Sequence, residues 1–240
     1  MCIAILNTSG VIDESTFRVC WDQNPDGGGI AYTDGSNLKV YKEMHSVEKL
    51  YTHYLRIRQD NTLPMILHFR IATSGSIDKE NCHPFEVHPG LVMAHNGIIE
   101  HVEPTEEIND TRLFVDLLKG LPDDFLDNPA ICQLISVFIG YSKLIFLDRY
   151  GEFRIINDEL GHWDKAHRNW FSNHSYCRPP VNVKEYDRTQ SSADNNTRWQ
   201  KYFEQQQRCA CCAEWTSEND LSYDRNLNAN ICRWCWEFLG

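Results

Sequence analysis

Apolar residues form short continuous runs and helical stripes along the chain up to about residue 172. Continuous runs predict buried strands at 3–6, from 65 into a polar, glycine-containing corner at 73–75, and at 91–99. Shorter strands are predicted at 30–32, 38–41, 143–147, 153–156 and 169–172. Apolar positions at helical spacing predict helices at 46–59 and 129–138 and another that begins near 109–111. Strands, then helices, then strands favour a layered α+β core that ends near residue 177.

Glycine-containing segments separate several of these elements. Residues 24–29, Asn-Pro-Asp-Gly-Gly-Gly, require a sharp turn or a close backbone approach, and we expect a tight turn between two strands. A phosphate-binding loop has weak support here, because no Lys-Ser/Thr pair follows. Asp34-Gly35 predicts a hairpin into 38–41. Asn96-Gly97 has two interpretations: a two-residue hairpin turn, or an amide side chain and a backbone N–H that converge on an oxyanion.

The composition is typical of a soluble globular protein, with 42% hydrophobic residues among 240. The net charge of −11 argues against broad, non-specific nucleic-acid binding, which needs a basic surface. The sequence contains neither an 18-residue apolar run nor a charged-then-apolar amino-terminal region, so we expect no membrane span and no signal peptide. Ten cysteines without a secretion signal then favour a reducing compartment, the cytoplasm.

After residue 177 the chain becomes polar and then rich in cysteine. Residues 178–208 predict a linker, with a short helix at 197–207, between a large domain at 2–177 and a small module at 209–240. In that module Cys209, Cys212, Cys232 and Cys235 form two Cys-x-x-Cys pairs with 19 residues between them, which is the spacing of a four-thiolate zinc ribbon. Cys211 leaves the first pair ambiguous, and a redox dithiol or free thiols are the alternatives.

Four thiolate ligands leave no open coordination position, so the zinc ion would be structural. A segment of about 30 residues could not otherwise bury enough apolar surface to fold. Trp215, Arg233, Trp234 and Trp236 would form either a partner surface, which includes contact with nucleobases, or the small core around the metal.

The first residues of the chain carry unusual chemistry. Cys2 follows Met1, and aminopeptidases remove an initiator Met when a small residue follows it. The remaining chain would start with a thiol and a free α-amine, whose ordinary pKa of about 7.7–8.0 leaves part of it neutral at physiological pH. Such a residue is a nucleophile that carries its own proton acceptor. On residues 1–6 alone, a small apolar side chain near a frayed end is the simpler interpretation.

Three further residues also have two interpretations each. Arg70 emerges from the apolar run that starts at 65, so it needs either an internal carboxylate or the carboxylate of a ligand. Asp110 lies at a predicted helix start, where its position favours a helix N-cap over a ligand-binding carboxylate. His83, before a proline, is more typical of a packed or capping residue than of a catalytic one.

Several short motifs occur in a defined order along the chain. They are Cys2, the glycine loop at 24–32, His-x-Arg-x-Ala-Thr at 68–73, Asn-x-His-Pro-Phe at 81–85, His-Asn-Gly at 95–97 and Asn-Asp-Thr at 109–111. With these motifs in this order, the chain resembles the class II glutamine amidotransferases, enzymes with an amino-terminal nucleophile. The resemblance is to the compact, stand-alone branch of this family and covers residues 2–175. Each motif alone is weak, but the ordered set is specific. The resemblance implies a four-layer αββα sandwich, the Ntn-hydrolase fold.

The resemblance also implies roles for the matched residues. Cys2 would attack the side-chain amide carbon of glutamine, and its α-amine would take and return the proton. Arg70 would bind the substrate α-carboxylate and Asp110 its α-ammonium. The side chain of Asn96 and the N–H of Gly97 would form the oxyanion hole. Glutamine would yield ammonia and a thioester, and hydrolysis of the thioester would release glutamate.

Thr73 and His83 match positions that shape the substrate pocket, whereas Ser74 stands where many relatives carry His. Residues 178–240 are too few for a synthase domain, so we expect a glutaminase that supplies ammonia to a separate acceptor enzyme, with the zinc module as its dock. The second hypothesis is a γ-glutamyl amidohydrolase that acts on a peptide or small conjugate, because Arg70 and Asp110 would recognise any γ-glutamyl group. The third is an inactive, zinc-dependent module that binds nucleic acid or protein.

Overall fold

The structure, a computed structural model, describes residues 2–164, 166, 168–177, 206–208, 215–217, 221–224 and 229–233. The chain divides into two compact units, Met1–Pro180 and Val181–Gly240. In the described part of the chain, no helix has the length and apolar character needed to cross a membrane.

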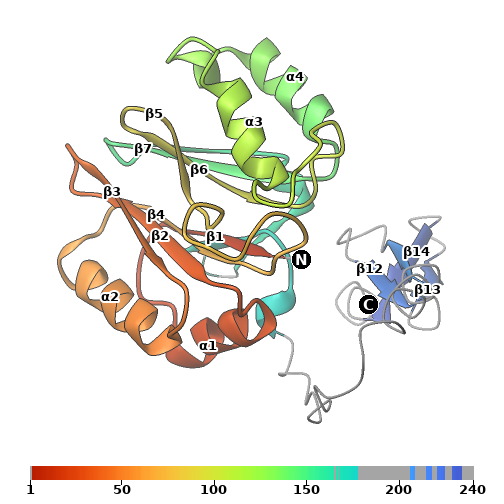
Figure 1. The fold of residues 1–240 in the computed structure, drawn as a ribbon. Helices are drawn as coiled ribbons and strands as arrows, with labels where there is room; N and C mark the ends of the chain where they lie inside the picture. The colour runs from red at the N-terminus through yellow and green to blue at the C-terminus, as the bar shows by residue number, and fades with distance from the viewer. Residues whose placement is uncertain are drawn as a thin grey trace. The chain divides into compact units, whose positions relative to one another are not determined.

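Two antiparallel sheets form the centre of the first unit (Figure 1). The larger sheet has the strand order β3-β2-β4-β1-β10-β9 and the smaller sheet the order β5-β6-β7-β8. The larger sheet consists of β1 (Ile3–Asn7), β2 (Gly28–Thr33), β3 (Leu38–Glu43), β4 (Met65–Phe69), β9 (His162–Trp163) and β10 (Asn169–Phe171). The smaller sheet consists of β5 (Phe85–His88), β6 (Leu91–Asn96), β7 (Lys143–Asp148) and β8 (Phe153–Ile156).

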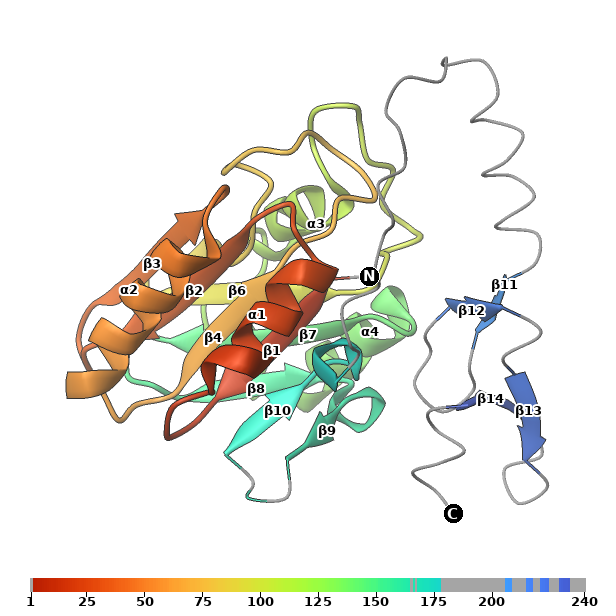
Figure 2. The same cartoon turned by 90° about the horizontal axis from the view of Figure 1, so that it is seen from below.

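Helices cover the outer face of each sheet. α1 (Glu14–Gln23) and α2 (Val47–Asp60) lie on the larger sheet, as Figure 2 shows from that side. α3 (Asp110–Leu118) and α4 (Pro129–Ile139) lie on the smaller sheet. Short 3₁₀ helices follow at η1 (Phe125–Asp127), η2 (Asp158–Leu160) and η3 (Ser175–Cys177).

Hydrophobic clusters hold these layers together. One cluster packs α1 and α2 on the larger sheet through residues such as Phe17, Tyr54 and Phe69. A second packs α3 and α4 on the smaller sheet, with Phe114 and Phe146 among its members. A third lies between the two sheets and consists of Ala4, Leu6, Ala31, Ile66, Val92, Ala94, Ile145, Leu147 and Trp170. The layer order is therefore helix, sheet, sheet, helix, which agrees with the α+β sandwich that the resemblance implies.

Local sequence explains where two of the helices begin. The side chains of Ser46 and Asn109 each accept a hydrogen bond from the backbone N–H three residues later, so these residues are the N-caps of α2 and α3. Asp110 is instead the first residue of α3. The interpretation of Asp110 as a helix N-cap is therefore wrong, because the neighbouring asparagine already fills that position.

The glycine loop differs from the expected turn between two strands. It follows α1, a helix that the apolar pattern did not predict, because α1 buries only the short stripe Phe17, Cys20 and Trp21. Gly27 has a φ of +120°, and the next two glycines already belong to β2. A Cβ atom on Gly29 would lie 2.9 Å from the carbonyl carbon of residue 83. The glycines therefore allow a close approach of two backbone segments.

The two predicted hairpins have opposite outcomes. Residues 34–37 connect β2 to β3 in antiparallel register, which confirms the hairpin at Asp34-Gly35. Asn96-Gly97 is not a hairpin, because Asn96 ends β6 and the chain continues toward α3. The hairpin interpretation failed because β6 pairs with β5 and β7, and not with a strand that follows directly.

In the second unit the structure describes two strand pairs. β11 (Gln206–Arg208) pairs with β12 (Trp215–Ser217), and β13 (Leu221–Asp224) pairs with β14 (Ala229–Cys232). Residues 206 and 207 lie in a strand, which contradicts the end of the helix expected at 197–207. The rest of that helix, most of the linker and the predicted zinc ligands Cys209, Cys212 and Cys235 lie outside the described residues.

Candidate active site

The Cys2 thiol lies at the end of the larger sheet, directly before β1. Ile3 pairs with Phe69 in antiparallel register, so the next residue pair brings Cys2 beside Arg70. The Cys2 Sγ atom lies 3.4 Å from both the backbone N and the backbone O of Ile71. The apolar strand Ile3–Asn7 is fully buried and therefore fixes the position of this thiol within the fold.

The thiol is a weak acid in this environment. Burial raises the pKa of the Cys2 thiol above its ordinary value, and the hydrogen bond from Ile71 N–H and the nearby Arg70 charge partly offset this. A thiol with a raised pKa is mostly protonated at neutral pH, so it needs a base before it can act as a nucleophile. An α-amine on the same residue would be such a base.

Two asparagine side chains hold the backbone of Cys2. The Nδ2 atoms of Asn96 and Asn173 both donate to the carbonyl oxygen of Cys2, the second at 2.8 Å. Asn96 is completely buried at the end of β6, so its bond joins the two sheets. Sequence analysis missed Asn173, because 171 residues separate it from Cys2 and it lies in no recognisable motif.

Arg70 follows β4 and is almost completely buried, with 2% of its surface exposed. Its backbone N donates to Gly27 O and its backbone O accepts from Asp26 N, which ties it to the glycine loop. The guanidinium donates to Ser74 O from Nη2 at 3.1 Å, whereas Nη1 has no hydrogen-bond partner among the described residues. The internal ion pair considered for Arg70 is not formed in that part of the chain. A buried, unpaired cationic donor costs more than about 1–3 kcal/mol, so this geometry favours a ligand carboxylate.

A hydrogen-bond network holds the segment after Arg70 against the start of α3. Asn81 Oδ1 accepts from Asn109 N, and Asn109 Nδ2 donates to Asn81 O, both at 3.0 Å. Asn81 Nδ2 donates to Glu107 O at 2.7 Å. A Cβ atom on Gly75 would lie only 2.7 Å from Asn109 N, so the two segments are in close contact. This contact fixes the segment that carries Arg70 against the residue next to Asp110.

Asp110 is buried and accepts three hydrogen bonds. Its Oδ2 accepts from Ile99 N at 2.8 Å, and its Oδ1 accepts from Thr111 N at 2.8 Å and, at 3.4 Å, from Thr111 Oγ1. The carboxylate therefore connects the start of α3 to the segment after Gly97. Two oxygens offer about four acceptor positions, so one remains for an ammonium group.

Asn96 and Gly97 lie together where β6 ends. Asn96 Nδ2 carries two hydrogens and one holds the Cys2 carbonyl, so the other is available to a ligand. Gly97 has a φ of +138°, and a Cβ atom there would lie 2.8 Å from Ser142 Cα. Only glycine fits this position. The interpretation of Asn96 and Gly97 as oxyanion donors is compatible with the hydrogen bond from Asn96 to Cys2, and it stays a prediction.

Thr73 is exposed, whereas His83 is buried in a row of histidine rings. The His83 ring stacks on His68 at 4.1 Å and lies 6.1 Å from His95, and its Nδ1 accepts from His95 N. Burial lowers the pKa of His68 to about 3, that of His95 to about 4 and that of His83 well below its ordinary value. These rings are therefore neutral and packed together, and the role of His83 in shaping the substrate pocket stays a prediction.

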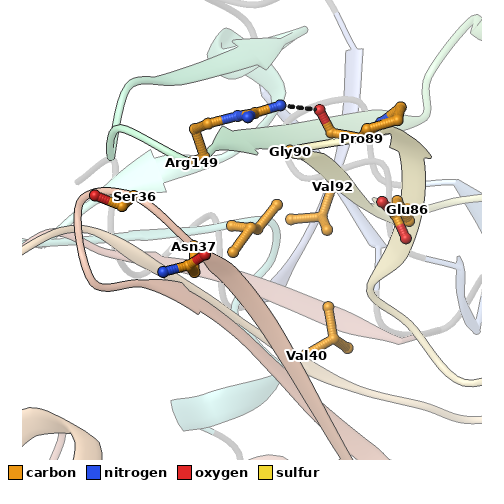
Figure 3. Close-up of a pocket in the computed structure, with 9 residues that line it drawn as sticks. Ser36, Asn37, Val40, Glu86, Pro89, Gly90, Val92 and Arg149 are labelled. Carbon is orange, nitrogen blue, oxygen red and sulfur yellow. Dashed lines mark hydrogen bonds between the residues drawn. The ribbon is translucent and has the colours of Figure 1, made fainter.

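A separate cavity of about 370 Å³ lies at the opposite end of the sandwich (Figure 3). Val40 and Val92 line it together with Glu86 and Arg149, and the Arg149 guanidinium donates to Pro89 O. Arg149 follows the end of β7, while the start of that strand pairs with Asn96. Because the predicted site residues lie at the Asn96 end, this cavity is not the candidate active site.

Comparisons with known proteins identify the family of the chain. The sequence profile of glutamine amidotransferases class-II matches residues 8–142, more than half of the chain. A Haemophilus influenzae protein classed as a glutamine amidotransferase is 27% identical over 159 residues, which are 61% of this chain and 53% of that protein. The amidophosphoribosyltransferase of Mus musculus is 35% identical over 121 residues, 46% of this chain and 22% of that enzyme. A solved glutamine phosphoribosylpyrophosphate amidotransferase of B. subtilis has a TM-score of 0.48 at 17% identity and covers 71% of this chain and 41% of that chain.

Fold and site together define a protein built as a sandwich of two sheets between helices, with a thiol directly before its first strand. The profile match shows, more specifically, that the chain belongs to the class-II glutamine amidotransferases. The chain spans about half the length of the Haemophilus influenzae relative and about a fifth of the mouse enzyme.

Proposed function

We propose that this protein hydrolyses the side-chain amide of glutamine through a Cys2 thioester and supplies the ammonia to a separate acceptor enzyme. The observation that carries the proposal is the buried guanidinium of Arg70, whose Nη1 has no acceptor among the described residues. Arg70 follows Phe69, the strand partner of Ile3, so its backbone lies next to that of Cys2, whose thiol is the proposed nucleophile.

Each charged end of an amino acid then has a complementary group. Arg70 binds the α-carboxylate and Asp110 the α-ammonium, which fixes the substrate by its backbone end and directs its side chain to the thiol. The thiol proton passes to the α-amine of Cys2 as the sulfur attacks the amide carbon. The α-amine then donates this proton to the amide nitrogen, which leaves as ammonia. Asn96 Nδ2 and Gly97 N–H stabilise the oxyanion that forms in between. Water then hydrolyses the thioester to glutamate.

This mechanism requires removal of Met1, since an amide nitrogen is not a base. The test is mass spectrometry of the purified chain before and after treatment with 6-diazo-5-oxonorleucine, a glutamine-like electrophile. We expect a chain that begins at Cys2, one adduct on its sulfur, and protection by excess glutamine. An active enzyme that retains Met1, or an adduct on another cysteine with Cys2 unmodified, would contradict the mechanism.

The acceptor enzyme is part of this proposal because hydrolysis of glutamine would release free ammonia, which an acceptor enzyme would consume. Purified protein should hydrolyse glutamine slowly by itself and faster with its partner. Competition between glutamine and γ-glutamyl dipeptides separates this function from a γ-glutamyl amidohydrolase, since Arg70 and Asp110 would bind both. A dipeptide hydrolysed with a higher kcat/KM than glutamine would favour the second function.

We also propose that Cys209, Cys212, Cys232 and Cys235 bind one structural Zn²⁺. The described residues contain no group of three or more His, Cys, Asp or Glu side chains arranged for a metal, but only Cys232, which ends β14, is among them. Metal analysis should give one zinc per chain, and Cys232→Ser should lose it. A zinc-free wild-type chain of unchanged stability would contradict this proposal. Nucleic-acid contact through the nearby tryptophans stays a prediction.

A further inference from the structure

The oxyanion segment, residues 97–99, connects β6 to the loop before α3. In the proposed function the N–H of Gly97 is one of two groups that stabilise the oxyanion. Glycine has a flexible backbone, so the direction of this N–H depends on how the residues on either side are held. On the upstream side, Asn96 pairs with Lys143 in the ladder of β6 and β7.

On the downstream side, the peptide unit between Ile98 and Ile99 is held at both of its polar atoms. Ser142 Oγ donates to Ile98 O at 2.9 Å. Ile99 N donates to Asp110 Oδ2 at 2.8 Å. Since both the carbonyl and the N–H are engaged, this peptide unit cannot rotate, and the backbone of Gly97 is confined between two fixed points.

Ser142 itself is rigidly held and almost completely buried, with 1% of its surface exposed. Its N donates to Ile139 O at 3.1 Å, and its O accepts from Asn157 Nδ2 at 2.8 Å. Its Cα and Cβ occupy the space where a side chain on Gly97 would begin. Ser142 therefore contacts the oxyanion segment twice, once by the hydroxyl hydrogen bond and once by packing.

We infer that Ser142 is a positioning residue for the oxyanion hole. Its hydroxyl holds the carbonyl of Ile98 so that the N–H of Gly97 points to the place where negative charge develops on the substrate. The inference rests on the proposed glutaminase function. It assigns a role to a residue that touches neither the substrate nor Cys2 and that belongs to none of the sequence motifs.

The test compares Ser142→Ala with wild type in glutamine hydrolysis. Removal of one oxyanion donor lowers kcat by about 100- to 1,000-fold, and a misdirected donor should cost less, about 10- to 100-fold. KM for glutamine should change less than about 3-fold, since Arg70 and Asp110 are intact. Glutamate γ-semialdehyde, which adds the thiol to form an oxyanion-like centre, should bind more weakly by the same factor as the loss in kcat. Binding of the product glutamate should not change.

The matched control is Thr33→Val, which deletes another buried hydroxyl that donates to a backbone carbonyl, that of Arg149. It lies at the other end of the sandwich, so it should lower the melting temperature similarly and leave kcat within about 2-fold of wild type. An unchanged kcat in Ser142→Ala would overturn the inference, as would equal weakening of the aldehyde and of glutamate. A wild-type chain that does not hydrolyse glutamine would instead overturn the proposed function, together with this inference.

Discussion

Gly97→Ala is the substitution whose cost the structure predicts most directly. The backbone of Gly97 has a φ of +138°, a conformation that residues with a Cβ atom adopt at a cost of about 1–3 kcal/mol. The new Cβ atom would also lie 2.8 Å from both Cα and Cβ of Ser142, and closer still to its Oγ. Overpacking of this kind costs about 1–3 kcal/mol. We therefore expect the free energy of unfolding to fall by about 2–6 kcal/mol.

Gly97→Ala should also lower the activity of the molecules that remain folded, beyond the loss caused by unfolding. Either the segment moves away from Ser142 or the strand β7 shifts, and both displace the N–H of Gly97. We expect kcat for glutamine hydrolysis to fall by at least about 100-fold in the fraction that remains folded. Urea unfolding followed by fluorescence gives the stability, and ammonia release gives the rate. Ser142→Ala should not rescue the variant, because Cα and Cβ of that residue remain in contact.

Gly35→Ala is the matched control. Gly35 has a φ of +90°, but a Cβ atom there would meet only one side chain, at an ordinary 3.9 Å. The free energy of unfolding of Gly35→Ala should therefore fall only by the cost of the backbone conformation, about 1–3 kcal/mol, and its activity should be unchanged. The reasoning is refuted if Gly97→Ala is no less stable than Gly35→Ala, or if it retains wild-type kcat.

Three further predictions concern the substrate clamp and the buried histidines. Arg70→Lys should raise KM for glutamine about 10- to 100-fold, because one compact ammonium replaces a guanidinium fork, and an unchanged KM would exclude the carboxylate contact. Asp110→Asn should lower kcat/KM more for glutamine than for glutaramate, which lacks the α-ammonium, and equal losses for both would contradict the assigned role. The unfolding free energy should fall as the pH drops from 6.5 toward 4, because the unfolded chain takes up protons that His68 and His95, with pKa values of about 3 and 4, cannot bind when folded. Each of these histidines contributes up to about 1.4 kcal/mol per pH unit in that window, and urea titrations at pH 7, 6 and 5 with no change would refute this.

The sequence by itself determined the class of chemistry and most of the strands. Apolar runs mark β1, β4, β6 and β7, because strands buried on both faces need uninterrupted hydrophobic residues. The ordered motifs around Cys2, Arg70 and Asn96 identified the family before any contact was known. The apolar pattern of the sequence did not predict α1, because the buried stripe of this helix is too short to show a clear helical period.

Tertiary structure alone decided how these groups are held and which of them act together. In the described part of the chain, Arg70 forms no internal ion pair. Asn109 is the N-cap of α3, so the carboxylate of Asp110 can bind other groups. Asn173 and Ser142 lie in no motif and were identified only from the structure. Asn173 binds Cys2, 171 positions away along the chain, and Ser142 binds Ile98, 44 positions away. Local periodicity cannot encode such contacts, because they depend on which strands become neighbours in the sheets and on where each strand ends.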